Sequence, residues 1–383
     1  MNSPVRAPDH HQSIGARLFA LLAEENSNEN VAVSPASITA VLKVLSLGAA
    51  GHTRQLLETA LASDERGVPG SSHIKGPGNR TIEFDTATSV WVRSDVALLP
   101  AFVESANRMC AAVAKALPKT APEIAVNNWV SEKTRGCIRE IMRPYQPLDL
   151  LTLVNAAYFK GWWTFEFDEA LTRDGDFQLP DGSRKSVPFM KETSPFNLHR
   201  NEQFDWVRLP YGYGRFAMDL LLPRAPRFEP DHVFSLLSLG EEGSPALQSI
   251  DQVCIELPRF SLDSESSLTA PLKSLGLEEI FDFENADFSN MVSDMTFNTI
   301  PNEIPLAVGE VQHKIYLAVD ESGTEAAGAT ALMLAAGSIS ARQPPPPPVV
   351  RFDRPFLLAI RDVADGHVLF TAAVRNPSDR AAG

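Results

Sequence analysis

The sequence lacks the short motifs by which common enzyme active sites are recognised. It contains no GxSxG, HExxH or GxxxxGK, and Gly212-Tyr213-Gly214 stops short of a complete GxGxxG loop. The eight histidines are scattered, and two of them, His10 and His11, fall in an N-terminal tail. We therefore expect a protein that is not an enzyme and that needs neither a metal nor a cofactor.

Cysteine and basic residues are also scarce. Three cysteines, Cys110, Cys137 and Cys254, are odd in number, widely spaced and free of any CxxC pair, so neither a disulfide framework nor a zinc site is indicated. The formal charge of -14 disfavours nucleic acid and anionic membranes as partners. No apolar run is long enough to span a bilayer, and residues 1–11 lack the apolar core of a secretory signal. A cytoplasmic protein is expected, or a secreted one if a leader has been removed.

What the sequence does contain is an ordinary globular composition, with 44% hydrophobic residues among 383. We find no internal repeat, and we expect a single domain over residues 1–383 with a disordered tail at residues 1–12. Helical spacing occurs near residues 14–25, 37–47, 53–61, 101–117 and 125–142, whereas residues 67–78 are rich in Gly and Pro and predict a loop. Strand patterns occur at residues 89–92, 152–159, 215–222, 253–257, 314–319, 356–361 and 368–374. Helices precede strands, which predicts an α+β fold.

The most informative segment is ESGTEAAGATA at residues 321–331. It follows KIYLAVD (314–320), whose alternation predicts a half-buried strand. For ten residues after that strand the side chains are small, yet they are mostly Ala and Thr rather than turn formers. Such a segment is suited to slip between two strands, or else it is a flexible tether before the prolines at 344–348.

Several motifs in order give this chain a resemblance to the serpin family, of inhibitory and prokaryotic type. They are NVAVSPASI (30–38), GAAGHT (48–53), NWV (128–130) with TRG (134–136), LVNAAYFKGWW (153–163), VPFMK (187–191), LPRF (257–260), ADFS (286–289), FDRPF (352–356) and NP (376–377). The resemblance implies the serpin fold, with three β-sheets, eight to nine helices and an exposed reactive-centre loop at residues 321–350. It also implies a monomeric suicide-substrate inhibitor of serine proteases, whose cleaved loop inserts into the main sheet.

The resemblance assigns residues to three clusters. The hinge comprises Glu321, Gly323, Thr324, Ala326, Ala327, Gly328, Ala329 and Thr330. The shutter, a hydrogen-bonded cluster below the point where the sheet opens, comprises Ser34, Ser37, Asn155 and His313. The breach, at the top of the sheet, comprises Trp162, Arg259 and Glu321, with Arg259 expected to pair with Glu321.

The loop is patterned for a sheet that it has yet to enter. Counted from Thr324, the inward set is Thr324, Ala326, Gly328, Thr330, Leu332 and Leu334, and the charge of Glu325 falls on the opposite face. Family spacing places the scissile bond at Gly337-Ser338, with Ala336 as a close alternative. These small residues suit an elastase-like or subtilisin-like protease, whereas the other alternative, Arg342, would suit a trypsin-like one.

Two departures from the family pattern matter. Residues 62–81 are too short and too rich in Gly and Pro for the usual helix D, so heparin binding is not expected. The loop after the hinge is about seven residues longer than is typical, which leaves the scissile bond open between the alternatives above. The competing function is a non-inhibitory serpin that acts as a carrier, a chaperone or a plain protease substrate.

Overall fold

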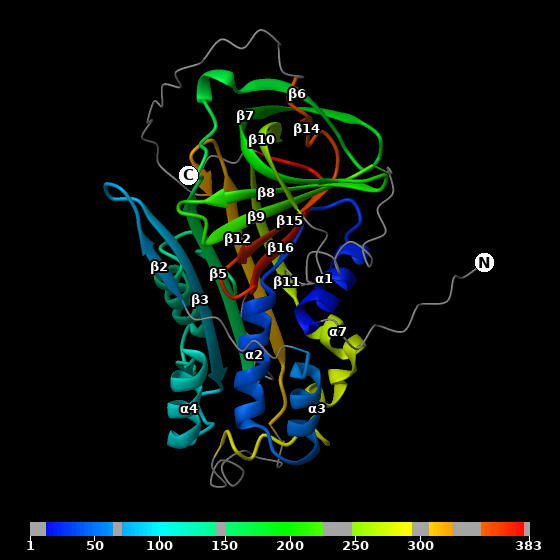
Figure 1. The fold of residues 1–383 in the computed structure, drawn as a ribbon. Coiled ribbons are helices and arrows are strands. Elements are labelled where there is room, and N and C mark those ends of the chain that lie inside the picture. Colours follow the sequence, from blue (N-terminus) through cyan, green and yellow to red (C-terminus); the bar gives the residue numbers. More distant parts are fainter. Residues whose placement is uncertain are drawn as a thin grey trace, which may run out of the picture.

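The computed structural model describes residues 13–63, 71–142, 151–224, 247–292, 306–324 and 346–378. Helices gather toward one end of the molecule, and strands β6, β7, β10 and β14 lie at the other (Figure 1). The helices are α1 (Ile14–Glu25), α2 (Pro35–Gly48), α3 (Gly51–Leu61), α4 (Pro100–Cys110), α5 (Pro122–Lys133) and α7 (Thr269–Leu272), with short turns at η1 (Glu169–Leu171), η2 (Lys273–Leu277) and η3 (Glu278–Phe281). Eight to nine helices were expected for the whole chain. That number cannot be compared directly with this list, because the list holds only the helices of the described residues.

A seven-stranded sheet, here called the main sheet, carries the predicted site. Its order is β11 (Phe260–Ser267), β12 (Glu310–Val319), β13 (Gly323–Thr324), β5 (Leu151–Trp162), β3 (Thr81–Val92) and β2 (Ser72–Lys75), with β4 (Val113–Ala116) also paired to β3. Nearly every residue of β5 is buried. This explains its almost unbroken apolar sequence, because a strand covered on both faces has no need to alternate.

The second sheet holds nine strands and closes the core behind the main sheet. Its order is β1 (Val31–Val33), β16 (Val368–Val374), β15 (Phe356–Asp362), β9 (Phe216–Pro223), β8 (Phe204–Tyr211), β7 (Arg184–Arg200), β10 (Gln248–Pro258) and β14 (Val349–Arg351), with β6 (Arg173–Gln178) beside β7. Three sheets were expected; within the described residues, backbone hydrogen bonds join two of them into this nine-stranded sheet. The reason is that β7 runs unbroken for 17 residues and pairs with β6 at one end and with β8 at the other.

Helix α2 lies between the two sheets, where it contacts β3, β5 and β16. Its start follows from sequence, because the Ser34 side chain accepts the Ser37 N–H as an N-cap and Pro35 occupies the first turn. Nearly all of its residues are buried, and its first turn reaches the middle of the main sheet.

The α+β prediction is confirmed, and the predicted bounds of α1 and β16 match the observed ones. Three local predictions were wrong. The helix predicted over 101–117 ends at Cys110, since Ala111 adopts a left-handed conformation and residues 113–116 form β4. The helix predicted over 125–142 ends at Lys133 because Arg135 and Gly136 both have positive φ. The predicted loop at 67–78 contains strand β2, which pairs with β3.

Candidate functional site

The candidate site lies where the chain leaves β12 and turns back into the main sheet. Strand β13 is antiparallel to both neighbours, with Thr324 opposite Val319 of β12 and Gly161 of β5. Beyond β13 the same two neighbours pair directly with each other in parallel, from Glu310 opposite Thr152 to Tyr316 opposite Tyr158. Two residues of the hinge thus occupy the mouth of a slot whose remaining length is closed.

A tight turn from Asp320 to Gly323 brings the hinge into this position. The Asp320 carboxylate accepts the N–H groups of Ser322 at 2.9 Å and Gly323 at 3.0 Å. The Ser322 carbonyl accepts the Trp163 N–H at 3.0 Å, which ties the turn to the end of β5. Burial raises the pKa of Asp320. The two backbone donors reduce this increase without cancelling it, so the pKa stays above its ordinary value.

The breach cluster lies at the top of the slot. Arg259 donates to Glu321, which is the expected contact, and Thr172 Oγ1 donates to the same carboxylate at 2.6 Å. Glu321 is 4% exposed, and burial alone would raise its pKa, but the hydrogen bonds from Arg259 and Thr172 outweigh burial and lower it. Trp162 is buried and lies opposite Gly323 in the strand register. The role of this cluster in holding the slot closed stays a prediction.

Gly323 and Thr324 fit the mouth of the slot for separate reasons. A Cβ on Gly323 would overlap the Gly161 carbonyl oxygen and the Trp162 Cα, so only glycine permits this approach. Thr324 is fully buried, and its hydroxyl lies 2.6 Å from the Tyr211 hydroxyl of β8. The side chain therefore points toward the second sheet, on the inward face assigned from sequence.

The four shutter residues form one buried hydrogen-bonded cluster. His313 Nε2 accepts the Ser34 N–H at 3.1 Å, so Nδ1 carries the proton and donates to Asn155 Oδ1 at 2.8 Å. Ser34 Oγ donates to the Leu369 carbonyl at 2.7 Å and lies 3.0 Å from Ser37 Oγ. Burial lowers the pKa of His313 to about 4, so the imidazole is neutral at physiological pH.

The shutter cluster spans the two strands that a new strand would separate. His313 lies on β12 directly opposite Asn155 on β5, and their side chains are bonded across that pairing. Asn155 Nδ2 also donates to Thr88 Oγ1 at 3.0 Å and to the Ser37 carbonyl at 3.4 Å. A strand inserted between β12 and β5 must therefore break the bond between His313 and Asn155.

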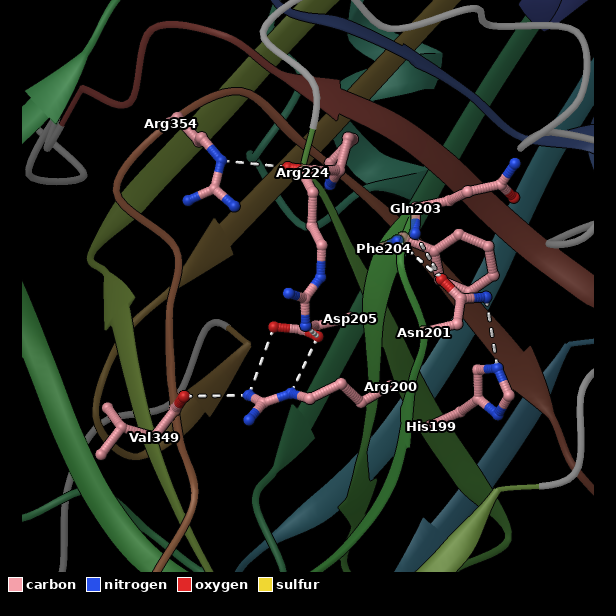
Figure 2. A network of polar contacts seen from close by, with 10 residues as sticks. His199, Arg200, Asn201, Gln203, Phe204, Asp205, Arg224, Val349 and Arg354 are labelled. Atoms are coloured by element: carbon pink, nitrogen blue, oxygen red, sulfur yellow. Dashed lines mark hydrogen bonds and ion pairs between the residues drawn. The ribbon is translucent and has the colours of Figure 1, made fainter.

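The far end of the reactive loop rejoins the fold at β14, an edge strand paired only with β10 among the described residues. Figure 2 shows Arg200 donating to the Val349 carbonyl, at 3.0 Å, while it pairs with Asp205. Arg224 binds the same carboxylate at 2.8 Å. Two residues further along β14, Arg351 pairs with Glu256 and lies 4.4 Å from the centre of the Phe189 ring. These contacts anchor β14 beyond what three backbone pairs provide.

Three contributors to the site were missed from sequence: Thr88, Thr172 and Tyr211. Each reaches the site from a strand or turn far away in the chain, and none carries a local signal. The remaining predicted residues lie outside the described residues; they are Ala326, Ala327, Gly328, Ala329, Thr330, Ala336, Gly337, Ser338 and Arg342. Within the described ranges, no three His, Cys, Asp or Glu side chains are grouped to hold a metal ion, and no helix could cross a membrane.

Comparison with known proteins agrees with this architecture. The family model for serpins (serine protease inhibitors) matches residues 9–377. Plasminogen activator inhibitor 1 of Bos taurus is 31% identical over 382 residues, which are 95% of this chain and 90% of that protein. Serpin-ZXA of Oryza sativa subsp. japonica is 33% identical and covers 96% of both chains. The crystal structure of human thyroxine-binding globulin superposes with a TM-score of 0.80 over 97% of this chain and 98% of that one, at 21% identity.

Proposed function

This chain belongs to the serpin family, and we propose that it is a suicide-substrate inhibitor that traps serine proteases as covalent acyl-enzymes. The observation that supports this function most is the arrangement of β13. Gly323 and Thr324 of the hinge already lie between β12 and β5, with Thr324 paired to both in antiparallel register, while the rest of that slot is closed. The protein thus holds a strand position that its own loop can fill.

The register fixes how the loop would fill the slot. Thr324 faces Gly161, so continuing residue by residue would bring residue 334 opposite Leu151, where β5 begins. On the other side, residue 333 would face Glu310, the first residue of β12. The slot therefore accepts the ten residues 325–334, which would extend about 33 Å at about 3.3 Å each. Residues 326, 328, 330, 332 and 334 would share the inward face that Thr324 occupies now.

Insertion would be driven by new backbone pairing. A ten-residue strand placed between β12 and β5 gains two ladders of hydrogen bonds and replaces one, a net gain of roughly ten bonds. At about 1 kcal/mol each, these bonds would contribute about 10 kcal/mol, and the inward side chains would add buried apolar area, against an ordering cost of about 1–2 kcal/mol per residue. The closed pair and its shutter cluster separate these two states, so the present fold would be kinetically trapped.

The protease is trapped if the cleaved loop inserts faster than the acyl-enzyme is hydrolysed. When the protease has cut the loop and is still esterified to it, insertion would drag the protease along the main sheet. The oxyanion hole depends on donors placed within fractions of an ångström, so distorting it would halt hydrolysis of the acyl-enzyme. By family spacing the cut lies at Gly337-Ser338, with Ala336 and Arg342 as alternatives. The preferred target is therefore an elastase-like or subtilisin-like protease.

The test is to mix the protein with elastase-like, subtilisin-like and trypsin-like proteases and look for a covalent complex that survives boiling in detergent. Mass spectrometry of the released C-terminal peptide would identify the cleaved bond. A complex with at least one protease is expected. Clean cleavage by every protease, with no complex, would instead favour a non-inhibitory serpin.

A further inference from the structure

Tyr211, at the end of β8, lies directly beneath the mouth of the slot. It is fully buried, stacks on Trp163 with ring centres 4.4 Å apart, and meets the edge of Phe159 at 5.0 Å. The aromatic packing fixes the ring, so the phenol oxygen has a defined position. Within the described residues, that oxygen has one hydrogen-bonding partner, Thr324 Oγ1 at 2.6 Å.

The slot is shaped to let this contact form. A Cβ on Gly161 would press against both Tyr211 and Phe159, so the glycine leaves room for the two rings below the strand. Gly323 passes over Gly161 at a distance that no side chain would allow. Two glycines on facing strands thus let Thr324 reach down to the phenol.

We propose that Tyr211 is a positioning residue that holds the hinge in an inserted starting position through the Thr324 hydroxyl, before any protease arrives. This inference rests on the proposed inhibitory function. The Tyr211 hydroxyl is uncharged, because burial raises the pKa of the phenol well above its ordinary value. If Thr324 left the slot, this buried hydroxyl would lose its partner, and an unpaired buried polar group is costly. The contact therefore favours the docked hinge over a released one.

The consequence is kinetic. Starting a new strand costs backbone entropy before neighbouring residues gain pairing, so the first residues are the hardest to place. With Gly323 and Thr324 already docked, the cleaved loop needs only to extend an existing strand. The ratio of cleaved to trapped inhibitor equals the deacylation rate divided by the insertion rate. A weaker starting contact should raise this ratio by slowing insertion alone.

The experiment uses three variants of the full chain: Tyr211→Phe, Thr324→Val and the double variant. Tyr211→Phe keeps the ring on Trp163, and Thr324→Val keeps the branched shape, so both remove only the hydroxyl-to-hydroxyl bond. Each single variant should raise the cleaved-to-trapped ratio roughly 3- to 10-fold, the effect of losing one hydrogen bond. The double variant should be no worse than either single one. Tyr213→Phe, on an exposed ring two residues away, is the matched control.

Hydrogen exchange provides a readout that needs no protease. The peptide covering residues 320–324 should exchange roughly 3- to 10-fold faster in both single variants than in the wild-type protein. Unchanged exchange and an unchanged ratio in Tyr211→Phe, or additive effects in the double variant, would overturn the inference while leaving inhibition intact. A wild-type protein that traps no protease would instead refute the proposed function, and hydrogen exchange would then still decide whether Tyr211 holds the hinge.

Discussion

Acidification should destabilise this protein through His313, the buried histidine of the shutter cluster. Its pKa is about 4 in the folded protein because burial disfavours the charged ring. An unfolded histidine has a pKa of about 6.5. Between those two values the unfolded chain binds a proton that the folded protein does not. The stabilising contribution of neutral His313 is therefore complete above about pH 6.5 and is lost as the pH falls toward 4.

The magnitude follows from the same pair of values. A difference of about 2.5 pKa units corresponds to about 3 kcal/mol of unfolding free energy at about 1.4 kcal/mol per unit. The assay is urea unfolding at several pH values for the wild type and for His313→Gln, which keeps a polar side chain but cannot titrate. Carboxylates such as Glu321 titrate in both proteins, so they cancel when the two pH profiles are subtracted. The wild type should lose about 3 kcal/mol more than the variant between pH 7 and pH 4. Parallel profiles would refute the assignment of a neutral, buried imidazole.

Three further predictions concern the loop and the slot. Thr324→Arg should abolish trapping while cleavage continues, because a charged side chain cannot occupy the fully buried position on Tyr211; normal inhibition by this variant would exclude insertion as the mechanism. Cleavage of the loop should raise the melting temperature by roughly 5 °C or more, because a net gain of a few kcal/mol on insertion shifts the melting temperature of a large chain by about that much; calorimetry of intact and nicked protein decides this. During incubation without protease, His313→Gln should speed spontaneous loss of inhibitory activity several-fold, whereas Arg351→Ala should leave that rate unchanged. If Arg351→Ala speeds the loss and His313→Gln does not, the barrier to spontaneous insertion lies at β14 and not at the shutter.

Those parts of the site that depend on local sequence pattern could be predicted. The strand at 314–319, the small residues after it and the inward face of Thr324 all follow from alternation and side-chain size. The start of α2 at Ser34 also follows from sequence, because a capping serine followed by proline is a local signal. The pairing of Arg259 with Glu321 came from the family resemblance, since 62 residues separate the two partners.

The features that could not be predicted from sequence depend on tertiary contacts. Tyr211 lies 113 residues from Thr324, and only the stacking of the two sheets brings their hydroxyls together. The helix at 101–117 has good local propensity, yet residues 113–116 pair with β3 because the sheet edge offers them a ladder. Strand β2 forms in a segment rich in Gly and Pro for the same reason: β3 is already in place beside it.

The length of the loop decides where the barrier to spontaneous insertion lies. Thr172 binds Glu321, and three residues later in the chain Gly175 leaves room for Arg351, so the hinge and β14 both contact the segment that leads into and begins β6. An uncut loop that filled the slot to residue 334 would descend about 33 Å and then return through residues 335–348. Fully extended, those 14 residues can span about 46 Å, which exceeds the descent of about 33 Å that the chain must reverse. Strand β14 would therefore not have to detach. We therefore expect the closed pairing of β12 with β5, bonded across by His313 and Asn155, to be the barrier that would keep the intact protein active.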